Sequence, residues 1–541
     1  MALCTVPSFN LNIQYDQCYP YQYLYDICNM YRLNFQNVFF INNDEHIRSL
    51  VGMNRRYSVQ TVVPVINNKK TYNRAISLFV KQNEIESPVQ HSIPKTLQFT
   101  SVEDEGDDNK RFYSTKTPYA CPSKEYVLSS PPTGYKPIGV QLLARHGSRT
   151  LNSHDYDVQT LKIWQLAKQK NMLTPLGEQL KEDTELFIGE NNHVGRGELT
   201  ELGKDEHIGI GSRLLHRLQS LFLPSNTVTV MTSGKKRAVD SCQQFVNGLT
   251  ESQNGIQIQN QSPNKSLLYF HKSCLSYRTF KKTDLDIRTK IHLIKNLPQT
   301  KAYAQQVLRR IYTKDFVDLL TNGYYEIQAD KYSDLLDKKF HQNEVDIVIC
   351  LYSMFSVAQA QNKPSLNNML AKYFNKEESY WFSYINDAQE FYVKGPSIEG
   401  KTVTYDMAKP LLADFFTSIN TRIEDPDNTV AAHLRFAHAE TIIPFATLLQ
   451  IPNFSDKSVH PLDIYTYENN PWRGNKTASM AANIQWEIYQ HEEHHDQILV
   501  RMLYNEMEVK FKSDCKSITS DSFFYDFNEL KRSYQHIFNM D

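Results

Sequence analysis

Residues 137–144 and the charged cluster that follows them constrain the fold more than any other stretch of the chain. The run PIGVQLLA is short and mostly apolar, and the sequence RHGSR occupies residues 145–149 directly after it. Such a run is typical of a strand that is covered on both faces in a parallel sheet. Ligands bind at the carboxyl ends of strands in open α/β sheets. We therefore expect an α/β fold, with a mostly parallel central sheet flanked by helices and a binding site where this strand ends.

The cluster at residues 145–149 has the composition of a phosphate site. The guanidinium groups of Arg145 and Arg149 bracket the imidazole of His146. Arginine binds phosphate oxygens through parallel N–H groups, and an imidazole held between two such groups can attack the phosphorus. Gly147 lets the backbone turn closely around an anion. Each residue alone is more simply a surface charge or a satisfied loop histidine, but the ordered combination after a strand favours the phosphate site.

A second strand-to-helix junction carries residues suited to the same chemistry. Residues 227–231 form an apolar run that leads into Lys235, Lys236 and Arg237 and then into an expected helix at 238–249. This kind of junction presents side chains and backbone amides to an anion, so Arg237 is a candidate phosphate ligand. A surface arginine at a helix start is the ordinary alternative.

A third junction is FAHAE at residues 436–440, between an expected strand at 431–436 and an expected helix at 441–449. A carboxylic acid at Glu440 can protonate a departing alkoxide, which a phosphomonoester with a poor leaving group needs. His438 can donate a hydrogen bond to phosphoryl oxygens. Taken alone, the tripeptide is an ordinary helix start with an acidic residue that favours the helix dipole.

Together these motifs resemble the histidine phosphatase superfamily. The sequence from Arg145 matches its RHGxRxP signature except at the last position, where Leu151 stands in place of proline. Residues 233–241 resemble its SxxxRxxDS segment, and HAE resembles the variant of the multiple inositol polyphosphate phosphatases. Weaker similarities to that subgroup are LLYF at 267–270, DAQEFYVKG at 387–395, the runs at 480–489 and 498–509, and the position of Cys515.

The resemblance implies a phosphomonoesterase that needs no metal and no cofactor. His146 would be the nucleophile that takes up the phosphoryl group as a phosphohistidine. Glu440 would protonate the leaving oxygen and then take a proton from the incoming water. The implied ligands of the phosphoryl group are Arg145, Arg149, Arg237 and His438. The implied substrates are small polyanions, namely inositol polyphosphates such as phytate, with bisphosphoglycerate as a further substrate of the family.

Two alternatives stay open at this point. A general acid phosphatase would use the same residues on simple esters, and a non-catalytic inositol-phosphate-binding protein would keep the pocket without turnover. Leu151 is the feature that favours the second alternative. An inositol polyphosphate needs cations beyond the phosphoryl site, and Lys235, Lys236 and Lys394 are the candidates for the rim of the pocket. Each is otherwise an ordinary solvated lysine.

The chain of 541 residues is long enough for more than one domain. Residues 1–100 are too aromatic for a disordered tail, and we expect a strand at 57–66 and a helix at 71–86 there, without a recognisable function. An acidic linker at 101–110 precedes the catalytic domain.

The catalytic domain is expected at residues 111–520. Its α/β core would cover 111–255 and 401–520, and a helical cap over the site would cover 256–400. In the core we expect helices at 159–187, interrupted by a loop at 174–175, and at 201–221, all packed on the sheet. In the cap we expect helices at 301–314, 333–361 and 365–393.

Composition argues against several classes of partner. The formal net charge is −1, so no global field attracts nucleic acid or a membrane. The longest apolar run, residues 347–355, is far shorter than the ~20 residues of a membrane helix. No basic residue precedes Arg32, so we recognise no secretory leader, although the resembled family is typically secretory. Eight dispersed cysteines leave the compartment open, and the oligomeric state is open as well.

One motif points to different chemistry. HEEHH at residues 491–495 fits HExxH, which on a helix places two zinc ligands one turn apart beside a glutamate base. Here the motif lies between two strand-like runs and has no amphipathic helix around it. We therefore expect a polar turn and not a metalloprotease site.

Overall fold

The computed structural model describes residues 38–41, 61–64 and 112–538, apart from residues 252, 254, 323–342, 362 and 426. The chain divides into two compact units, Met1–Gly106 and Asp107–Asp541. In the first unit, strand β1 (Val38–Ile41) pairs in parallel with β2 (Thr61–Pro64), which lies inside the strand expected at 57–66. The helix expected at 71–86 and the acidic linker lie outside the described residues.

The second unit is built on an eight-stranded sheet in the order β10-β8-β7-β3-β6-β4-β5, with β9 paired to β8. Strands β3, β6, β4 and β5 run parallel, and the remaining strands pair antiparallel. The bounds are β3 (Tyr135–Arg145), β4 (Thr227–Thr232), β5 (Gln257–Asn260), β6 (Val430–Ala437), β7 (Asn483–His491), β8 (Ile498–Tyr504), β9 (Met507–Val509) and β10 (Phe524–Asp526). The α/β fold with a central sheet flanked by helices is confirmed, and the carboxyl ends of β3, β4 and β6 meet at one edge.

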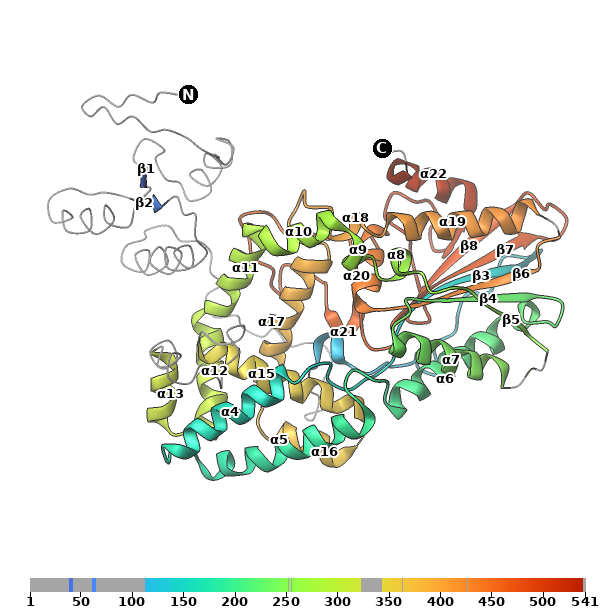
Figure 1. The fold of residues 1–541 in the computed structure, drawn as a ribbon. Coiled ribbons are helices and arrows are strands. Elements are labelled where there is room, and N and C mark those ends of the chain that lie inside the picture. The colour runs from blue at the N-terminus through green and yellow to red at the C-terminus, as the bar shows by residue number, and fades with distance from the viewer. Residues whose placement is uncertain are drawn as a thin grey trace, which may run out of the picture. The chain divides into compact units, whose positions relative to one another are not determined.

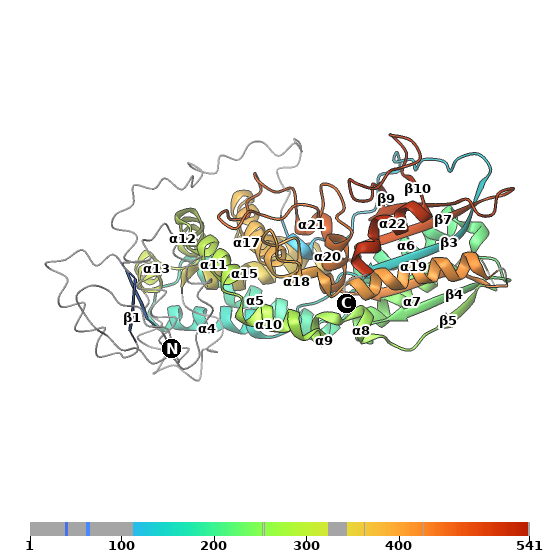
Figure 2. The ribbon, with the colours of Figure 1, turned by 90° about the horizontal axis from the view of Figure 1, so that it is seen from above.

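Helices cover both faces of this sheet (Figures 1 and 2). On one face, α6 (Glu201–Arg217) and α7 (Lys236–Thr250) pack on Val140 and Leu142 of β3 through residues such as Leu214 and Phe245, all of which are fully buried. On the other face lie α19 (Lys409–Glu424), α20 (Ala439–Leu448) and α22 (Phe527–Phe538). Burial on both faces explains why β3 reads as a nearly continuous apolar run.

The expected packing of residues 159–187 on the sheet is wrong. Helices α4 (Asp155–Gln169) and α5 (Pro175–Val194) form with the expected break, but they pack on the cap helices α15 (Glu344–Ala358) and α12 (Pro298–Ile311) (Figure 1). The contact is close, because a Cβ atom on Gly177 would lie 1.9 Å from the carbonyl oxygen of Ile311. Helical periodicity shows that a helix has an apolar face and does not show which element covers it.

The cap consists of further helices between β5 and β6. The helix expected at 365–393 is divided into two helices. Asn375 and Glu378 form a capping box at the start of the second of them. The helix expected at 333–361 corresponds to α15, and residues 323–342 lie outside the description. The remaining elements are α8 (Lys265–Leu268), α9 (Phe270–Ser273), α10 (Leu275–Thr283), α11 (Leu285–Asn296), α13 (Lys314–Thr321), α16 (Pro364–Ala371), α17 (Lys376–Lys394), α18 (Val403–Asp406), α21 (Gly474–Thr477), η2 (Ser114–Lys116), η3 (Gln219–Leu221) and η4 (Gln359–Gln361).

Among the described residues, no helix combines the length and the apolar character that a membrane crossing requires.

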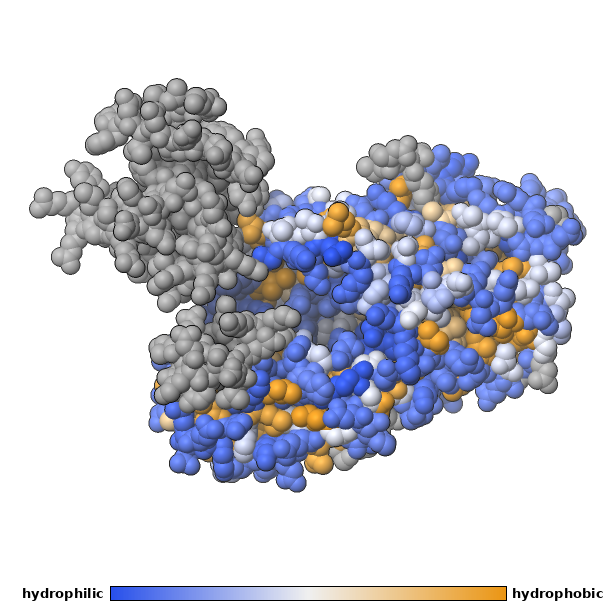
Figure 3. Space-filling view, viewed as in Figure 1, coloured by the Kyte–Doolittle hydropathy of each residue, from blue (hydrophilic) through white to orange (hydrophobic). Residues whose placement is uncertain are grey.

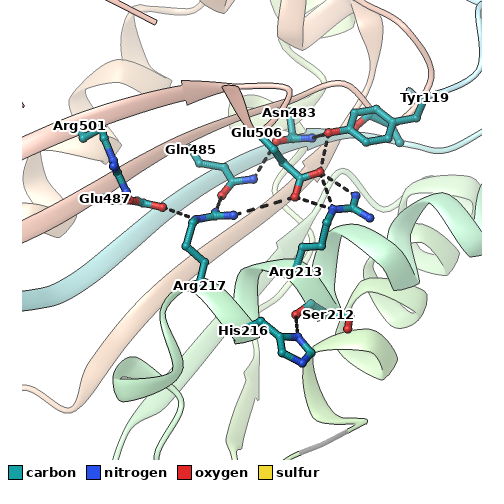
Figure 4. A network of polar contacts seen from close by, with 11 residues as sticks. Tyr119, Ser212, Arg213, His216, Arg217, Asn483, Gln485, Glu487, Arg501 and Glu506 are labelled. Atoms are coloured by element: carbon teal, nitrogen blue, oxygen red, sulfur yellow. Dashed lines mark hydrogen bonds and ion pairs between the residues drawn. The ribbon is translucent and has the colours of Figure 1, made fainter. Parts of the chain in front are cut away.

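An ionic network centred on two buried carboxylates fastens α6 to the antiparallel half of the sheet (Figure 4). Arg217 of α6 donates to Glu487 of β7 at 2.7 Å, and Arg501 of β8 pairs with the same carboxylate. One turn earlier, Arg213 lies 2.7 Å from Glu506. Removing one partner of a buried ion pair typically costs about 3–5 kcal/mol. The network therefore holds α6 at a defined position, which matters because α6 supports the site.

Candidate active site

The loop after β3 packs directly against the start of α6. A Cβ atom on Gly147 would lie 2.4 Å from the carbonyl oxygen of Gly203, and one on Gly203 would lie 2.1 Å from the carbonyl oxygen of Ser148. Gly147 is not among the residues with positive φ. The glycine is therefore required by the close approach of α6 and not by a turn around an anion.

Two buried residues of α6 hold this loop in place. Glu206 accepts from the backbone amide of Ser148 at 2.6 Å and from its hydroxyl at 2.7 Å. His207 lies with Nε2 3.1 Å from the carbonyl oxygen of Arg145, to which it donates. Neither residue was identified from the sequence, because nothing local distinguishes them from other polar residues of an amphipathic helix.

Leu151, which stands in place of the proline of the RHGxRxP signature, makes a hydrogen bond that a proline could not make. The backbone amide of Leu151 donates to the side-chain oxygen of Asn191 at 2.8 Å, and Leu151 is only 5% exposed. A proline at this position would have no N–H to donate. Leu151 thus anchors the end of the loop to α5 and leaves the charged groups of the loop untouched.

His146 is the buried residue at the centre of the site, with 2% of its surface exposed. Its Nδ1 lies 2.9 Å from the carbonyl oxygen of Gly147, and because a carbonyl can only accept, Nδ1 carries the proton. Nε2 therefore keeps a free lone pair. Burial, followed by the positive charges of Arg145 and Arg237, holds the pKa of His146 well below its usual value. The imidazole is neutral at neutral pH, which is the form a nucleophile needs.

The arginines around His146 have unused donors. Arg145 donates through Nη1 to the carbonyl oxygen of Thr115 at 2.7 Å, and Arg149 donates through Nη1 to that of Thr150 at 2.7 Å. The buried Nε atoms of Arg145, Arg149 and Arg237 have no hydrogen-bond partner in the described part of the chain. Burial, above all, lowers the pKa of Arg145 to about 10 and that of Arg149 to about 9, and the charge of Arg237 adds to both effects. A bound anion would relieve this repulsion.

His438 completes the ring of donors. Its ring centroid lies 5.4 Å from that of His146, and its Nε2 lies 2.8 Å from the hydroxyl of Ser233 at the end of β4. Nδ1 is buried and has no partner among the described residues. When Nε2 accepts from Ser233, Nδ1 carries the proton and can donate to an anion. Burial and the charge of Arg237 lower the pKa of His438 to about 3, so the ring is neutral.

Glu440 lies in the first turn of α20 beside a buried lysine. Its Oε1 is 3.2 Å from Nζ of Lys394, which is also 2.6 Å from the carboxylate of Glu390. Burial alone would raise the pKa of Glu440, but Lys394, His271, His438 and a backbone hydrogen bond together outweigh burial and hold this pKa well below its usual value, with Lys394 contributing the most of the four. Glu440 is therefore a carboxylate in the free protein, and it must gain a proton before it can donate one.

Figure 3 shows that the surface is hollowed between the regions of α10 and α4, with hydrophilic residues along the edges of the recess. The carboxyl ends of β3, β4 and β6 and the helix starts at α7 and α20 adjoin this region (Figure 1). The geometry thus combines a neutral imidazole, three arginines with unused donors and a carboxyl group at the carboxyl edge of a parallel sheet.

Residues 138–505 match the family model described as the histidine phosphatase superfamily (branch 2). The chain belongs to this family. Similar solved structures include the Bifidobacterium longum multiple inositol polyphosphate phosphatase in complex with inositol hexasulfate, with 30% identity, a TM-score of 0.71, and coverage of 78% of this chain and 97% of that one. The complex of the same protein with phosphate has a TM-score of 0.70 at 30% identity, with the same coverage of 78% and 97%.

A phytase from D. castellii shares the fold, with 17% identity, a TM-score of 0.57, and coverage of 79% of this chain and 84% of that one. No curated protein sequence gives a significant match. The resemblance to histidine phosphatases is therefore confirmed, and the protein is a phosphatase of branch 2.

The three lysines expected at the rim of this phosphatase's pocket lie in different surroundings. Lys394 is buried between two carboxylates and so is not a rim residue. Lys236 is exposed and pairs with Glu198 and Asp240 at 2.8 and 2.6 Å. Lys235 lies with Nζ 5.4 Å from the ring centre of Tyr269, which in turn is 4.9 Å from the ring of His438. Lys235 is exposed, and Tyr269 connects it to His438.

Lys116, in η2, could not be identified from the sequence either. Burial, above all, and the positive charges of Arg149 and Arg145 lower the pKa of Lys116 to about 7. The segment Ser-Thr-Lys-Thr that contains it has no signal for a phosphate site. The fold alone brings it to the loop 29 residues later in the chain, where Arg145 donates to Thr115.

The HExxH motif is not helical, as expected. Strand β7 ends at His491, residues 492–497 form an exposed turn, and β8 begins at Ile498. His491 accepts through Nδ1 from the amides of Glu493 and His494 at 3.2 and 3.1 Å. The two histidines of the motif are therefore not one helical turn apart, and the zincin geometry is not present.

Proposed function

We propose that this histidine phosphatase hydrolyses inositol polyphosphates through a phosphohistidine intermediate. The observation that carries the proposal is the neutral, buried His146 among three arginines whose Nε atoms are unused. Arg145, Arg149 and Arg237 form no ion pair with a carboxylate in the described part of the chain. Buried cations without counter-ions are costly, and a phosphate dianion is the ligand that fits their fork geometry.

The proposed reaction has two steps. The three Nε–H groups and Nδ1–H of His438 bind the phosphoryl oxygens. Nε2 of His146 then attacks the phosphorus, a P–N bond forms, the ester P–O bond breaks, and protonated Glu440 gives its proton to the leaving oxygen. In the second step Glu440 takes a proton from water, the water oxygen bonds to phosphorus, the P–N bond breaks, and inorganic phosphate leaves.

Cations beyond the phosphoryl site support a polyanionic substrate. Lys235 lies with Nζ 5.4 Å from the ring centre of Tyr269, and that ring is 4.9 Å from the ring of His438, so Lys235 places a positive charge beside the phosphoryl site. The Bifidobacterium longum relative, which binds inositol hexasulfate, supports the same substrate class.

Release of inorganic phosphate from inositol hexakisphosphate in the presence of a chelator tests the proposal. We expect several phosphates to be released per substrate, with kcat/KM at least about tenfold above that for nitrophenyl phosphate, which corresponds to 1.4 kcal/mol of added binding. Strong preference for simple esters would indicate a general acid phosphatase. Binding of the hexakisphosphate without turnover would indicate a non-catalytic binding protein.

The lysines next to Arg237 provide a matched pair for the electrostatic part of the proposal. Lys235→Ala should raise KM for inositol hexakisphosphate by about fivefold, the equivalent of a surface ion pair of ~1 kcal/mol. Lys236→Ala should leave KM nearly unchanged, because Lys236 is already paired with Glu198 and Asp240. The preference for the hexakisphosphate should shrink as ionic strength rises from low salt to about 0.5 M, because salt screens exposed charges. Equal effects of the two variants, or a preference insensitive to salt, would contradict this account.

A further inference from the structure

The segment of η2 that carries Lys116 is locked to the site from two sides. The carbonyl oxygen of Thr115 accepts from Nη1 of Arg145 at 2.7 Å, and that of Thr117 accepts from the amide of Met480 at 2.9 Å. Ser114 donates to Asp387 of α17 at 2.5 Å. Lys116 therefore lies where the phosphoryl loop, the cap helix α17 and the segment before β7 come together.

The other contacts of Asp387 show that this position is specified by the fold. Its second oxygen accepts from the hydroxyl of Tyr467 at 2.7 Å and from the amide of Gly474 at 3.0 Å. A Cβ atom on Gly474 would lie 2.3 Å from the carboxylate of Asp387, so this position must be glycine. One buried carboxylate thus joins η2, α17 and α21.

Lys116 is a partly buried cation with no counter-ion. Nζ lies 3.3 Å from the hydroxyl of Thr115, and no carboxylate in the described part of the chain is within ion-pair distance of it. The nearby Glu390 pairs with Lys394 instead. Burial and the positive charges of Arg149 and Arg145 lower the pKa of Lys116 to about 7. Such an arrangement destabilises the folded protein unless an anion binds.

The phosphoryl site does not need this lysine. Three arginine Nε–H groups and the Nδ1–H of His438 already supply four donors to the oxygens of one phosphoryl group. Lys116 adds an amine next to Thr115, whose carbonyl oxygen accepts from Arg145 of the phosphoryl loop. A polyphosphorylated ring carries further phosphate groups on the carbons next to the one that is attacked.

We propose that Lys116 binds a second phosphate group of the same substrate, on a ring carbon adjacent to the ester that His146 attacks. The inference rests on the proposed function and makes it more specific. It assigns Lys116 to substrate selection between polyphosphates and single phosphate esters, and not to the chemical step. A bound phosphate group would raise the pKa of Lys116 and so restore the positive charge that burial and the neighbouring arginines disfavour in the free protein.

Kinetics on two substrates test the assignment. Lys116→Met should lower kcat/KM for inositol hexakisphosphate by about 30-fold, in line with the loss of one partner of a desolvated charge pair. It should change kcat/KM for nitrophenyl phosphate by less than about threefold, within the range of an exposed charge. Lys116→Arg should recover most of the loss, because it restores the cation. Lys168→Met is the matched control, since Lys168 is an exposed lysine of α4 paired with Glu178.

Thermal unfolding gives a second readout that a structural role would not share. Without ligand, Lys116→Met should melt at the same temperature as the wild type or higher, because an uncompensated cation is removed. With saturating inositol hexakisphosphate, its stabilisation should be smaller than that of the wild type. Equal kinetic losses on both substrates, or a lower melting temperature of the free variant, would overturn the assignment. If the wild type hydrolyses neither substrate, the proposed function fails, and the ligand-induced melting shift still decides whether Lys116 binds the polyphosphate.

Discussion

His146→Ala should lose at least about 10⁴-fold of kcat on both inositol hexakisphosphate and nitrophenyl phosphate, as is typical when a covalent nucleophile is removed. The loss should be the same for both substrates, because each must pass through the same P–N bond. The fold should persist, since within the described part of the chain the side chain of His146 hydrogen-bonds only to the carbonyl oxygen of its neighbour Gly147. Circular dichroism and thermal melting of the variant check this control.

The intermediate itself can be trapped. When the wild type is denatured rapidly and without acid during turnover of a labelled substrate, one phosphoryl group should remain on the protein. This group should be stable in base and labile in acid, as expected for a phosphoramidate. His146→Ala should carry none. Full activity of the variant, or a phosphoenzyme stable in acid, would exclude His146 as the nucleophile.

The strands that carry the site could be predicted from the sequence for a definite physical reason. A parallel strand buried on both faces is a short apolar run, and its carboxyl end must meet those of its neighbours at one edge of the sheet. Residues 145–149, Arg237 and the HAE motif could therefore be placed near one another before any coordinates were known. The structure shows that β3, β6 and β4 are adjacent and in parallel register.

The residues that hold or complete the site could not be predicted in this way. Glu206 reaches Ser148 across 58 residues of sequence, and Lys394 reaches Glu440 across 46. Each is an ordinary charged residue of an amphipathic helix until the fold brings it to its partner. For the same reason Lys394 was expected at the rim and is in fact buried against the candidate acid.

Glu440→Gln should slow the hydrolysis of inositol hexakisphosphate by ~100-fold, within the usual contribution of a general acid. Its effect on nitrophenyl phosphate should be much smaller, because nitrophenolate departs without a proton. Glutamine keeps the size and the polar contacts of the side chain but cannot donate the proton of a carboxylic acid. Comparison of kcat for the two substrates in the wild type and the variant measures this difference, and equal losses on both would remove Glu440 from the role of acid.

The pH dependence gives a sharper form of the same test. In the free protein Lys394 holds the pKa of Glu440 low, so the protonated fraction of the carboxyl group grows as pH falls and shrinks as pH rises. A bound phosphate dianion beside the carboxylate raises its pKa, because the two negative charges repel each other. We therefore expect kcat on inositol hexakisphosphate to rise toward acidic pH in the wild type and Glu440→Gln to lose that dependence. Lys394→Met should move the dependence to higher pH, since it removes the positive charge that stabilises the carboxylate. A pH profile that stays unchanged in both variants would show that another group supplies the proton.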